Sequence, residues 1–228
     1  LDLVNPDELF TVADFQKEAN HAISDIQARG KIPIMVGGSG LYVDSVVFDF
    51  KLRSEADQKE RQKLEHLSTD ELQDYCKKYN YPLPENKLNR RYLIRTIETK
   101  GNVVKNNAMR PGVIMIGIDV EKTMLYKRVS QRIIKMIDEG IIQETSELYK
   151  KYNSKFESMK ANIYSIVKRF IDREINQDEM IKLAIVRDMQ LAKKQRTWFK
   201  RNPNIVWLKA SDIEAYVLSK LPKNSVKL

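Results

Sequence analysis

The feature that most constrains the fold is a short apolar run that ends in a glycine-rich turn. Residues 32–36 (IPIMV) lead directly into the turn 37–40 (GGSG). Before the run, residues 11–29 carry apolar side chains at helical spacing, with Thr11 and Asp14 placed as a variant of the capping box. The apolar run therefore predicts a buried strand that follows a helix. Helix, strand and turn in this order are typical of an α/β fold.

The α/β pattern resumes after a polar stretch. Residues 51–104 show polar helical patterns and no strand signal, so we interpret them as a small all-helical insertion. The apolar stretch 113–120 predicts a second strand, which is followed by a long helix over 122–150. The sequence ends with a helix over 178–200, a short strand at 205–208 and a helix at 212–220. We predict an α/β fold with a parallel sheet core flanked by helices, built from 1–50 and 105–228.

The charge is unevenly distributed along the chain. The 228 residues carry 40 Lys and Arg and 31 Asp and Glu, a net charge of +9. Residues 1–50 hold 3 basic and 8 acidic residues (−5), which leaves 37 basic and 23 acidic residues (+14) for 51–228. The basic part fits a polyanionic partner such as nucleic acid, or simply a solvated lysine-rich surface.

The cysteine count and the hydropathy of the sequence indicate in which cellular compartment the protein is expected. The single cysteine, Cys76, cannot form an internal disulfide, and no apolar run reaches the ~20 residues of a membrane span. We therefore expect a protein of the reducing cytoplasm. His21 and His66 have no partners at metal-ligand spacing, which argues against a metal site or a Cys–His nucleophile.

The glycine turn is the first candidate binding site. Gly37, Gly38, Ser39 and Gly40 follow a predicted strand and open a predicted helix, where main-chain N–H groups and the Ser39 hydroxyl could bind a phosphate. The turn matches neither GxxxxGKT nor GxGxxG, so an ordinary strand-to-helix connection is the alternative.

Paired arginines form the second candidate site. Arg128 and Arg132 are spaced i and i+4 on the predicted helix, so their guanidinium groups share one face and suit a diphosphate. A solvated face with local ion pairs is the alternative.

Two basic clusters are candidates for nucleic-acid contact. Lys193, Arg196 and Lys200 form a stripe at helical spacing, with Lys194 beside it and Trp198 and Phe199 expected in the core. Arg90, Arg91 and Arg95 form a second cationic patch.

Taken in order, these segments resemble the tRNA dimethylallyltransferases. Residues 2–15 look like the family stretch IDxxxPxexfsvadF, and GGSGLY at 37–42 resembles GGTGLY. Residues 128–148 resemble RIxxRvxxMlxxGlxxEvxxL, and AKKQRTWF at 192–199 resembles AKRQxTWF. The resemblance covers nearly the whole chain.

The resemblance implies a P-loop-type α/β domain with a helical insertion that grips the anticodon stem of tRNA. It implies transfer of a dimethylallyl group from dimethylallyl diphosphate to the exocyclic amine of the adenine 3′-adjacent to the anticodon, with Mg²⁺ on the diphosphate. Ser39 stands at a family threonine that contacts the diphosphate, and Arg132, with Arg128 beside it, would neutralise the leaving group. We expect a monomer whose tRNA contacts are Arg90, Arg91, Arg95, Tyr164, Lys193, Lys194, Gln195, Arg196 and Lys200.

The chain also departs from the family pattern. It contains neither the phosphate loop GxTxxGKT nor the segment DSxQxY with the proposed general base, so we expect further residues before Leu1 and no activity without them. The family element IGYxE is replaced at 162–166 (NIYSI), and Met189 and Tyr92 stand where the family has arginine. Two alternatives stay open: an RNA-binding relative that has lost the chemistry, and a P-loop kinase or other NTP-using transferase.

Overall fold

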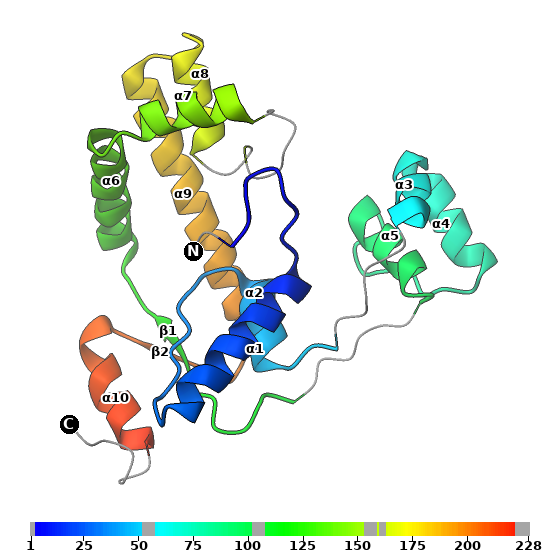
Figure 1. The fold of residues 1–228 in the computed structure, drawn as a ribbon, viewed down its shortest axis with the longest axis horizontal. Helices are drawn as coiled ribbons and strands as arrows, with labels where there is room; N and C mark the ends of the chain where they lie inside the picture. The colour runs from blue at the N-terminus through cyan, green and yellow to red at the C-terminus, as the bar shows by residue number, and fades with distance from the viewer. Residues whose placement is uncertain (1–2, 52–57, 102–107, 153–158, 160–162, 222–228) are drawn as a thin grey trace. The chain divides into compact units, whose positions relative to one another are not determined.

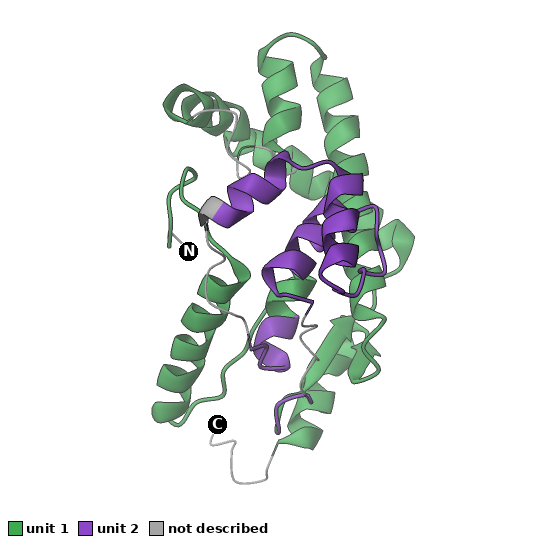
Figure 2. Ribbon diagram, turned by 90° about the vertical axis from the view of Figure 1, so that its right-hand side faces the viewer, with its two compact units in different colours: residues 1–43, 112–228 green, residues 44–111 purple. Residues whose placement is uncertain are grey.

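The computed structural model describes residues 3–51, 58–101, 108–152, 159 and 163–221. The chain divides into two compact units, one made of Leu1–Val43 and Gly112–Leu228 and the other of Asp44–Pro111 (Figure 2). We call them unit 1 and unit 2 and describe each by itself.

Unit 1 begins with helix α1, Val12–Ala28, whose start follows from the sequence. The Thr11 N–H donates to Asp14 Oδ2 at 2.8 Å, and the Asp14 N–H donates to Thr11 Oγ1 at 3.3 Å. The Thr11 hydroxyl also donates to Asp14 Oδ2, at 2.7 Å, and this bond, followed by the one from the Thr11 N–H, lowers the pKa of the Asp14 carboxyl. Gly30 follows the helix at φ +67°, a conformation that favours glycine. The predicted capping box and helix are confirmed.

The sheet of unit 1 consists of two parallel strands in the described part of the chain. Strand β1, Met115–Ile118, pairs with β2, Ile205–Leu208, with Met115 opposite Ile205. The Asp119 N–H donates to the Leu208 carbonyl at 2.8 Å and ends the pairing. The strands predicted at 113–120 and 205–208 are therefore present, the first shorter than expected.

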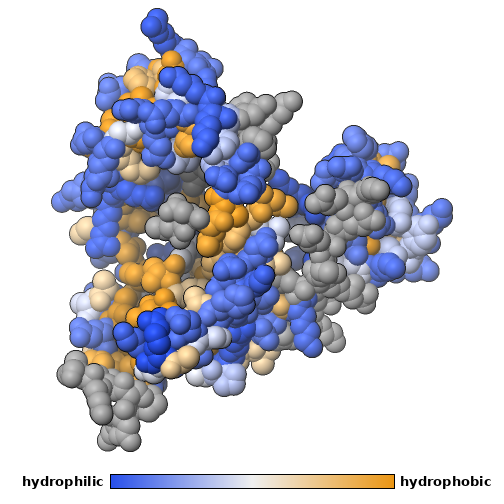
Figure 3. Space-filling view, viewed as in Figure 1, coloured by the Kyte–Doolittle hydropathy of each residue, from blue (hydrophilic) through white to orange (hydrophobic). Residues whose placement is uncertain are grey.

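The strand predicted at 32–36 is wrong. The segment has no strand structure, and Ile34 and Val36 are 83% and 91% exposed. A strand needs a neighbouring backbone as well as an apolar pattern, and among the described residues β1 and β2 pair only with each other. Apolar surface is visible on this unit near the two strands (Figure 3). The fold is therefore a mixed, helix-rich α/β structure with a small parallel sheet.

Four helices of unit 1 surround one apolar core (Figure 1). They are α6, Lys122–Asp138; α7, Ile141–Lys151; α8, Tyr164–Ile171; and α9, Gln177–Phe199. The buried core side chains are Val129, Ile133, Ile141, Ile166, Val167, Met180, Ala184 and Ile185. The single helix predicted over 122–150 is two helices, because Gly140 adopts φ +98° between them. A 3₁₀ turn, Ala210–Asp212, and helix α10, Ile213–Lys220, follow β2.

Helix α2, Gly40–Val47, leads from unit 1 into unit 2, which contains three further helices. They are α3, Gln58–His66; α4, Thr69–Lys78; and α5, Arg90–Glu98. Their buried side chains are Leu64, Leu72, Cys76, Leu93, Ile94 and Ile97. Burial raises the pKa of the Cys76 thiol, so this cysteine is a core residue. The expected boundaries of the insertion, 51 and 104, and its role at the anticodon stem stay predictions.

Candidate functional site

The predicted glycine turn lies between an extended segment and helix α2. The main-chain N–H groups of Tyr42 and Val43 both donate to the Ser39 carbonyl at 3.0 Å. Ser39 therefore stands at the start of α2, and it is exposed. The phenyl ring of Phe15 stacks on Tyr42 with ring centroids 4.7 Å apart, and the Tyr42 hydroxyl donates to the Phe10 carbonyl at 3.3 Å. These contacts attach the first turn of α2 to α1.

The last part of α9 packs closely against this turn. A Cβ atom placed on Gly38 would lie 2.3 Å from Gln195 Nε2, and one placed on Gly40 would lie 2.2 Å from Trp198 Cδ1. The glycines therefore allow an approach that a side chain would prevent. The sequence places GGSG and AKKQRTWF more than 150 residues apart, and the fold brings them together.

One arginine of the predicted pair, Arg132, contacts the same helix. Arg132 Nη1 lies 3.5 Å from Asp188 Oδ2 on α9, and the Asp188 side chain is only 14% exposed. Asp188 and Gln195 are seven residues apart, which is two turns or about 10.5 Å along one helix face. One face of α9 thus contacts both Arg132 and the glycine turn. Arg128 lies one turn before Arg132 on α6 and is exposed.

The basic residues of the α9 stripe lie in different environments. Lys193 and Lys194 line a groove of about 440 Å³, together with Gln190, Thr197, Trp198 and Arg201. Arg196 instead pairs with Asp119 at 2.8 Å, and its guanidinium carbon lies 5.7 Å from the centroid of the Trp207 ring. Lys200 caps the C-terminus of α9 and is exposed.

Lys193 and Lys194 were predicted to contact nucleic acid, whereas the groove residues Gln190 and Thr197 were not predicted. Gln190, Lys194, Thr197 and Arg201 follow one another at spacings of three and four residues, so the helical period could have grouped them. The Asp188 partner of Arg132 has no such signal, because the pair joins two helices that are distant in sequence.

The second cationic patch lies on α5 in unit 2. Arg90 Nη2 donates to the Glu65 carbonyl at 2.6 Å, and Arg95 pairs with Glu98 at 3.3 Å. Arg91 is exposed beside them. Two of the three guanidinium groups thus have partners inside unit 2, and all three residues remain accessible.

Tyr164 joins two helices of unit 1. Its hydroxyl donates to Glu144 Oε1 on α7 at 2.6 Å. Burial, followed by the hydrogen bond to Glu144, raises the pKa of Tyr164 to about 12. Ile166, at the glutamate position of the family element, is buried in the core, and Asn162 lies outside the described residues.

Replacing Tyr164 with phenylalanine is expected to lower the free energy of unfolding by about 0.5–1.5 kcal/mol, because it removes one hydrogen bond and keeps the ring. Since the folded pKa lies above the ordinary value of 10.0, this contribution is complete below pH 10 and is lost as the pH rises toward 12. Urea unfolding should therefore show a difference between wild type and Tyr164→Phe that is constant below about pH 10 and shrinks between about pH 10 and about pH 12. Tyr92→Phe, at an exposed position, is the control, and a difference independent of pH would contradict the assignment.

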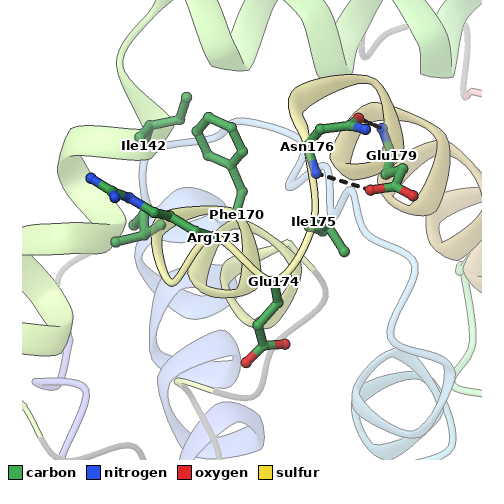
Figure 4. A pocket seen from close by; sticks show the side chains of 8 residues that line it. Ile142, Phe170, Arg173, Glu174, Ile175, Asn176 and Glu179 are labelled. Atoms are coloured by element: carbon green, nitrogen blue, oxygen red, sulfur yellow. Dashed lines mark hydrogen bonds between the residues drawn. The ribbon is translucent and has the colours of Figure 1, made fainter.

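A second cavity, of about 500 Å³, lies at the corner between α8 and α9 (Figure 4). None of the predicted site residues lines it. Three of its four polar side chains already have partners: Asn176 and Glu179 form the capping box of α9, and Glu174 pairs with Arg169 at 3.2 Å; the fourth is Arg173. We interpret this cavity as part of the helix corner.

Two kinds of feature are absent from the described residues. No group of three or more His, Cys, Asp or Glu side chains there could hold a metal ion. No helix in the same residues is long and apolar enough to cross a membrane.

Comparison with known proteins shows to which family the chain belongs. Residues 1–202 match the IPP transferase family over most of the chain. The chain belongs to this family. Among curated relatives, this IPP transferase is 34% identical to a tRNA dimethylallyltransferase of Anoxybacillus flavithermus, over 93% of the chain and 72% of the relative. It is 31% identical to one of Bacillus cereus, over 99% of the chain and 78% of the relative.

Solved structures agree with the IPP transferase assignment. The tRNA isopentenylpyrophosphate transferase of Bacillus halodurans is 30% identical, with a TM-score of 0.69 over 96% of this chain and 77% of that one. A eukaryotic dimethylallyltransferase, 23% identical, has a TM-score of 0.70 over 95% of this chain and 60% of that one, which shows the shared fold.

Proposed function

We propose that this IPP transferase is a tRNA dimethylallyltransferase, a prenyltransferase that modifies tRNA. It transfers the dimethylallyl group of dimethylallyl diphosphate to the exocyclic amine of the adenine 3′-adjacent to the anticodon. The observation that supports this most strongly is the single face of α9 that contacts both Arg132, through Asp188, and the glycine turn, at Gln195. A diphosphate is bound by cationic and main-chain donors, and this face of α9 contacts one element of each kind.

The chemistry is a substitution at the allylic carbon. The nitrogen lone pair forms the new N–C bond, the C–O bond to the diphosphate breaks, and the diphosphate leaves with the electron pair. The nitrogen loses one proton to a base. Arg132, Arg128, the Ser39 hydroxyl and the main-chain donors of Gly37, Gly38 and Gly40 would stabilise the charge that develops on the leaving group. The adenine must leave its stack to reach the carbon.

The larger architecture is part of the same proposal. A P-loop-type core would extend the small parallel sheet, and the helices of unit 2 would grip the anticodon stem. A monomer in the cytoplasm stays the expectation.

Mg²⁺ is proposed to accompany the diphosphate. This ion keeps several water ligands and is commonly held by substrate phosphates and one or two carboxylates. The described residues contain no cluster that forms a protein-built metal site. We therefore assign no step of the reaction to the ion.

Two surfaces are proposed to contact tRNA. In unit 1 they are the groove residues Lys193 and Lys194, with Lys200 and Arg196 nearby along α9. In unit 2 they are Arg90, Arg91 and Arg95 on α5. Tyr164 would contribute its ring, because its hydroxyl is already bonded to Glu144.

Removing two lysines should reveal whether the α9 stripe contacts phosphates. Lys193→Ala combined with Lys200→Ala is expected to weaken binding of an anticodon stem-loop and to reduce the slope of log K against log[salt] by about two units, because each phosphate contact releases counterions. Fluorescence anisotropy over a series of salt concentrations measures the slope.

Lys209→Ala combined with Lys220→Ala is the matched control, since it removes the same charge from exposed positions near α10. An unchanged slope in the Lys193/Lys200 variant, or an equal loss in the control, would show that the stripe is only solvated.

The reaction itself is tested on bulk tRNA. The full-length gene product that carries this chain is incubated with unmodified tRNA and dimethylallyl diphosphate, and the nucleosides are separated after digestion. We expect prenylated adenosine that requires the allyl donor and not a nucleoside triphosphate. Hydrolysis of a nucleoside triphosphate without prenylation would favour the kinase-like alternative, and tRNA binding without prenylation would favour the RNA-binding relative.

A further inference from the structure

Two residues of α9 lie against the glycine turn at positions where a Cβ atom would come within 3.0 Å of their side chains. A Cβ on Gly38 would lie 2.3, 2.6 and 2.9 Å from Nε2, Cδ and Oε1 of Gln195. A Cβ on Gly40 would lie 2.2, 2.4 and 2.5 Å from Cδ1, Nε1 and Cγ of Trp198. The main chain of the turn therefore rests on the Gln195 carboxamide and on the Trp198 indole.

Gln195 and Trp198 contact the glycine turn on both sides of Ser39. Gln195 and Trp198 are spaced i and i+3, so they lie on one face of α9. Their partners, Gly38 and Gly40, are separated by Ser39 alone, which is exposed. Two contacts on either side of one residue restrict both where that residue lies and how its main chain is directed. The helix thus controls the geometry at Ser39.

Trp198 contacts two other parts of unit 1. The guanidinium carbon of Arg201 lies 6.0 Å from the centroid of its ring, and the turn at Gly40 lies against the indole. The side chain is nevertheless 37% exposed and lines the groove, so the prediction that it lies in the core is wrong. Gln195 is half-buried and directed at the turn, whereas its neighbours Lys193 and Lys194 line the groove.

We propose that Gln195 and Trp198 are positioning residues, which hold the main chain of Gly38–Gly40 in the shape that binds the diphosphate. This proposal rests on the proposed function, and it replaces the predicted contact of Gln195 with tRNA. Main-chain donors bind an anion tightly only when their geometry is set beforehand, and a displacement of about 1 Å at such a site can cost about a hundredfold in rate. The side chains that set the geometry therefore affect the diphosphate without touching it.

The test enlarges the side chain at Gly38 and shortens the side chain at Gln195, first separately and then together. Gly38→Ala would push the Gln195 carboxamide away, and Gln195→Ala would leave the turn unsupported. Each change is expected to weaken binding of inorganic pyrophosphate about tenfold, measured by calorimetry on the full-length protein. In the double variant the new methyl group fits the vacated space, so the loss should again be about tenfold and not a hundredfold.

Three controls separate this role from others. Gly38→Ala combined with Lys194→Ala should be additive, because Lys194 lines the groove. Gln195→Met, which keeps the length of the side chain, should bind pyrophosphate within about threefold of wild type. Circular dichroism and urea unfolding identify any variant that fails to fold. In that case the pyrophosphate affinity of Gln195→Met is compared with that of the wild type.

The outcomes distinguish this proposal from the proposed function. Binding of the anticodon stem-loop should stay within about twofold for Gln195→Ala. Additive losses in the Gly38/Gln195 pair, or weaker stem-loop binding with unchanged pyrophosphate binding, would overturn the positioning role. Because pyrophosphate binding is measured without turnover, an inactive wild-type enzyme would refute the proposed function and leave this comparison intact.

Discussion

Arg132→Ala is expected to lower the turnover of prenyl transfer by about 10²–10³-fold, while the affinity for an anticodon stem-loop stays within about twofold. Arg132 lies on α6 with its guanidinium 3.5 Å from Asp188. Its proposed partner is the leaving diphosphate, whose charge grows only as the C–O bond breaks. Loss of such a donor removes stabilisation of the transition state and leaves ground-state binding of tRNA unaffected.

The effect should not come from instability. The Arg132 side chain is 68% exposed, so its ion pair with Asp188 contributes about 0–1 kcal/mol to folding. Lys135→Ala on the same helix removes the same charge from an exposed position and is the matched control. A large loss of stem-loop affinity with unchanged turnover at saturating tRNA would assign Arg132 to tRNA binding instead.

Ser39→Ala has the second largest expected effect, a rise in the activation barrier of up to about 3–4 kcal/mol, because one preorganised donor to the diphosphate is lost. Steady-state kinetics should place the loss in kcat and in KM for the allyl donor, with KM for tRNA unchanged. Ser39→Thr, which keeps the hydroxyl, is expected to retain most of the activity.

Ser219→Ala provides a control, since its hydroxyl is bonded to the Tyr216 carbonyl within α10. Wild-type kinetics for Ser39→Ala would mean that the GGSG segment is an ordinary connection between an extended segment and a helix.

Local features of the fold could be predicted from the sequence because they depend on neighbouring residues. The Thr11–Asp14 capping box and the glycine at the end of α1 are decided within a few residues of the helix ends. The short strand at 205–208 was also predicted where it lies. The segment 32–36 has an equally apolar pattern, but its backbone finds no partner among the described residues, and pattern alone cannot supply one.

The sequence predicts which residues belong to the candidate site better than it predicts the contacts between them. The spacing of Arg128 and Arg132 and the GGSG turn are visible in the sequence. The contacts of Arg132 and of the turn with α9, through Asp188 and Gln195, depend on how separate segments pack. Arg196 shows the same limit, because the basic stripe gives no sign that Asp119 and Trp207 surround this one member.

The central claim is that the protein transfers an allyl group to adenine beside the anticodon. The most direct test incubates the full-length gene product with labelled dimethylallyl diphosphate and an anticodon stem-loop that carries adenine 3′ of the anticodon, beside the same stem-loop with guanine there. We predict label in the adenine stem-loop alone. Salt-dependent binding of both stem-loops with no transfer of label to either would contradict the claim.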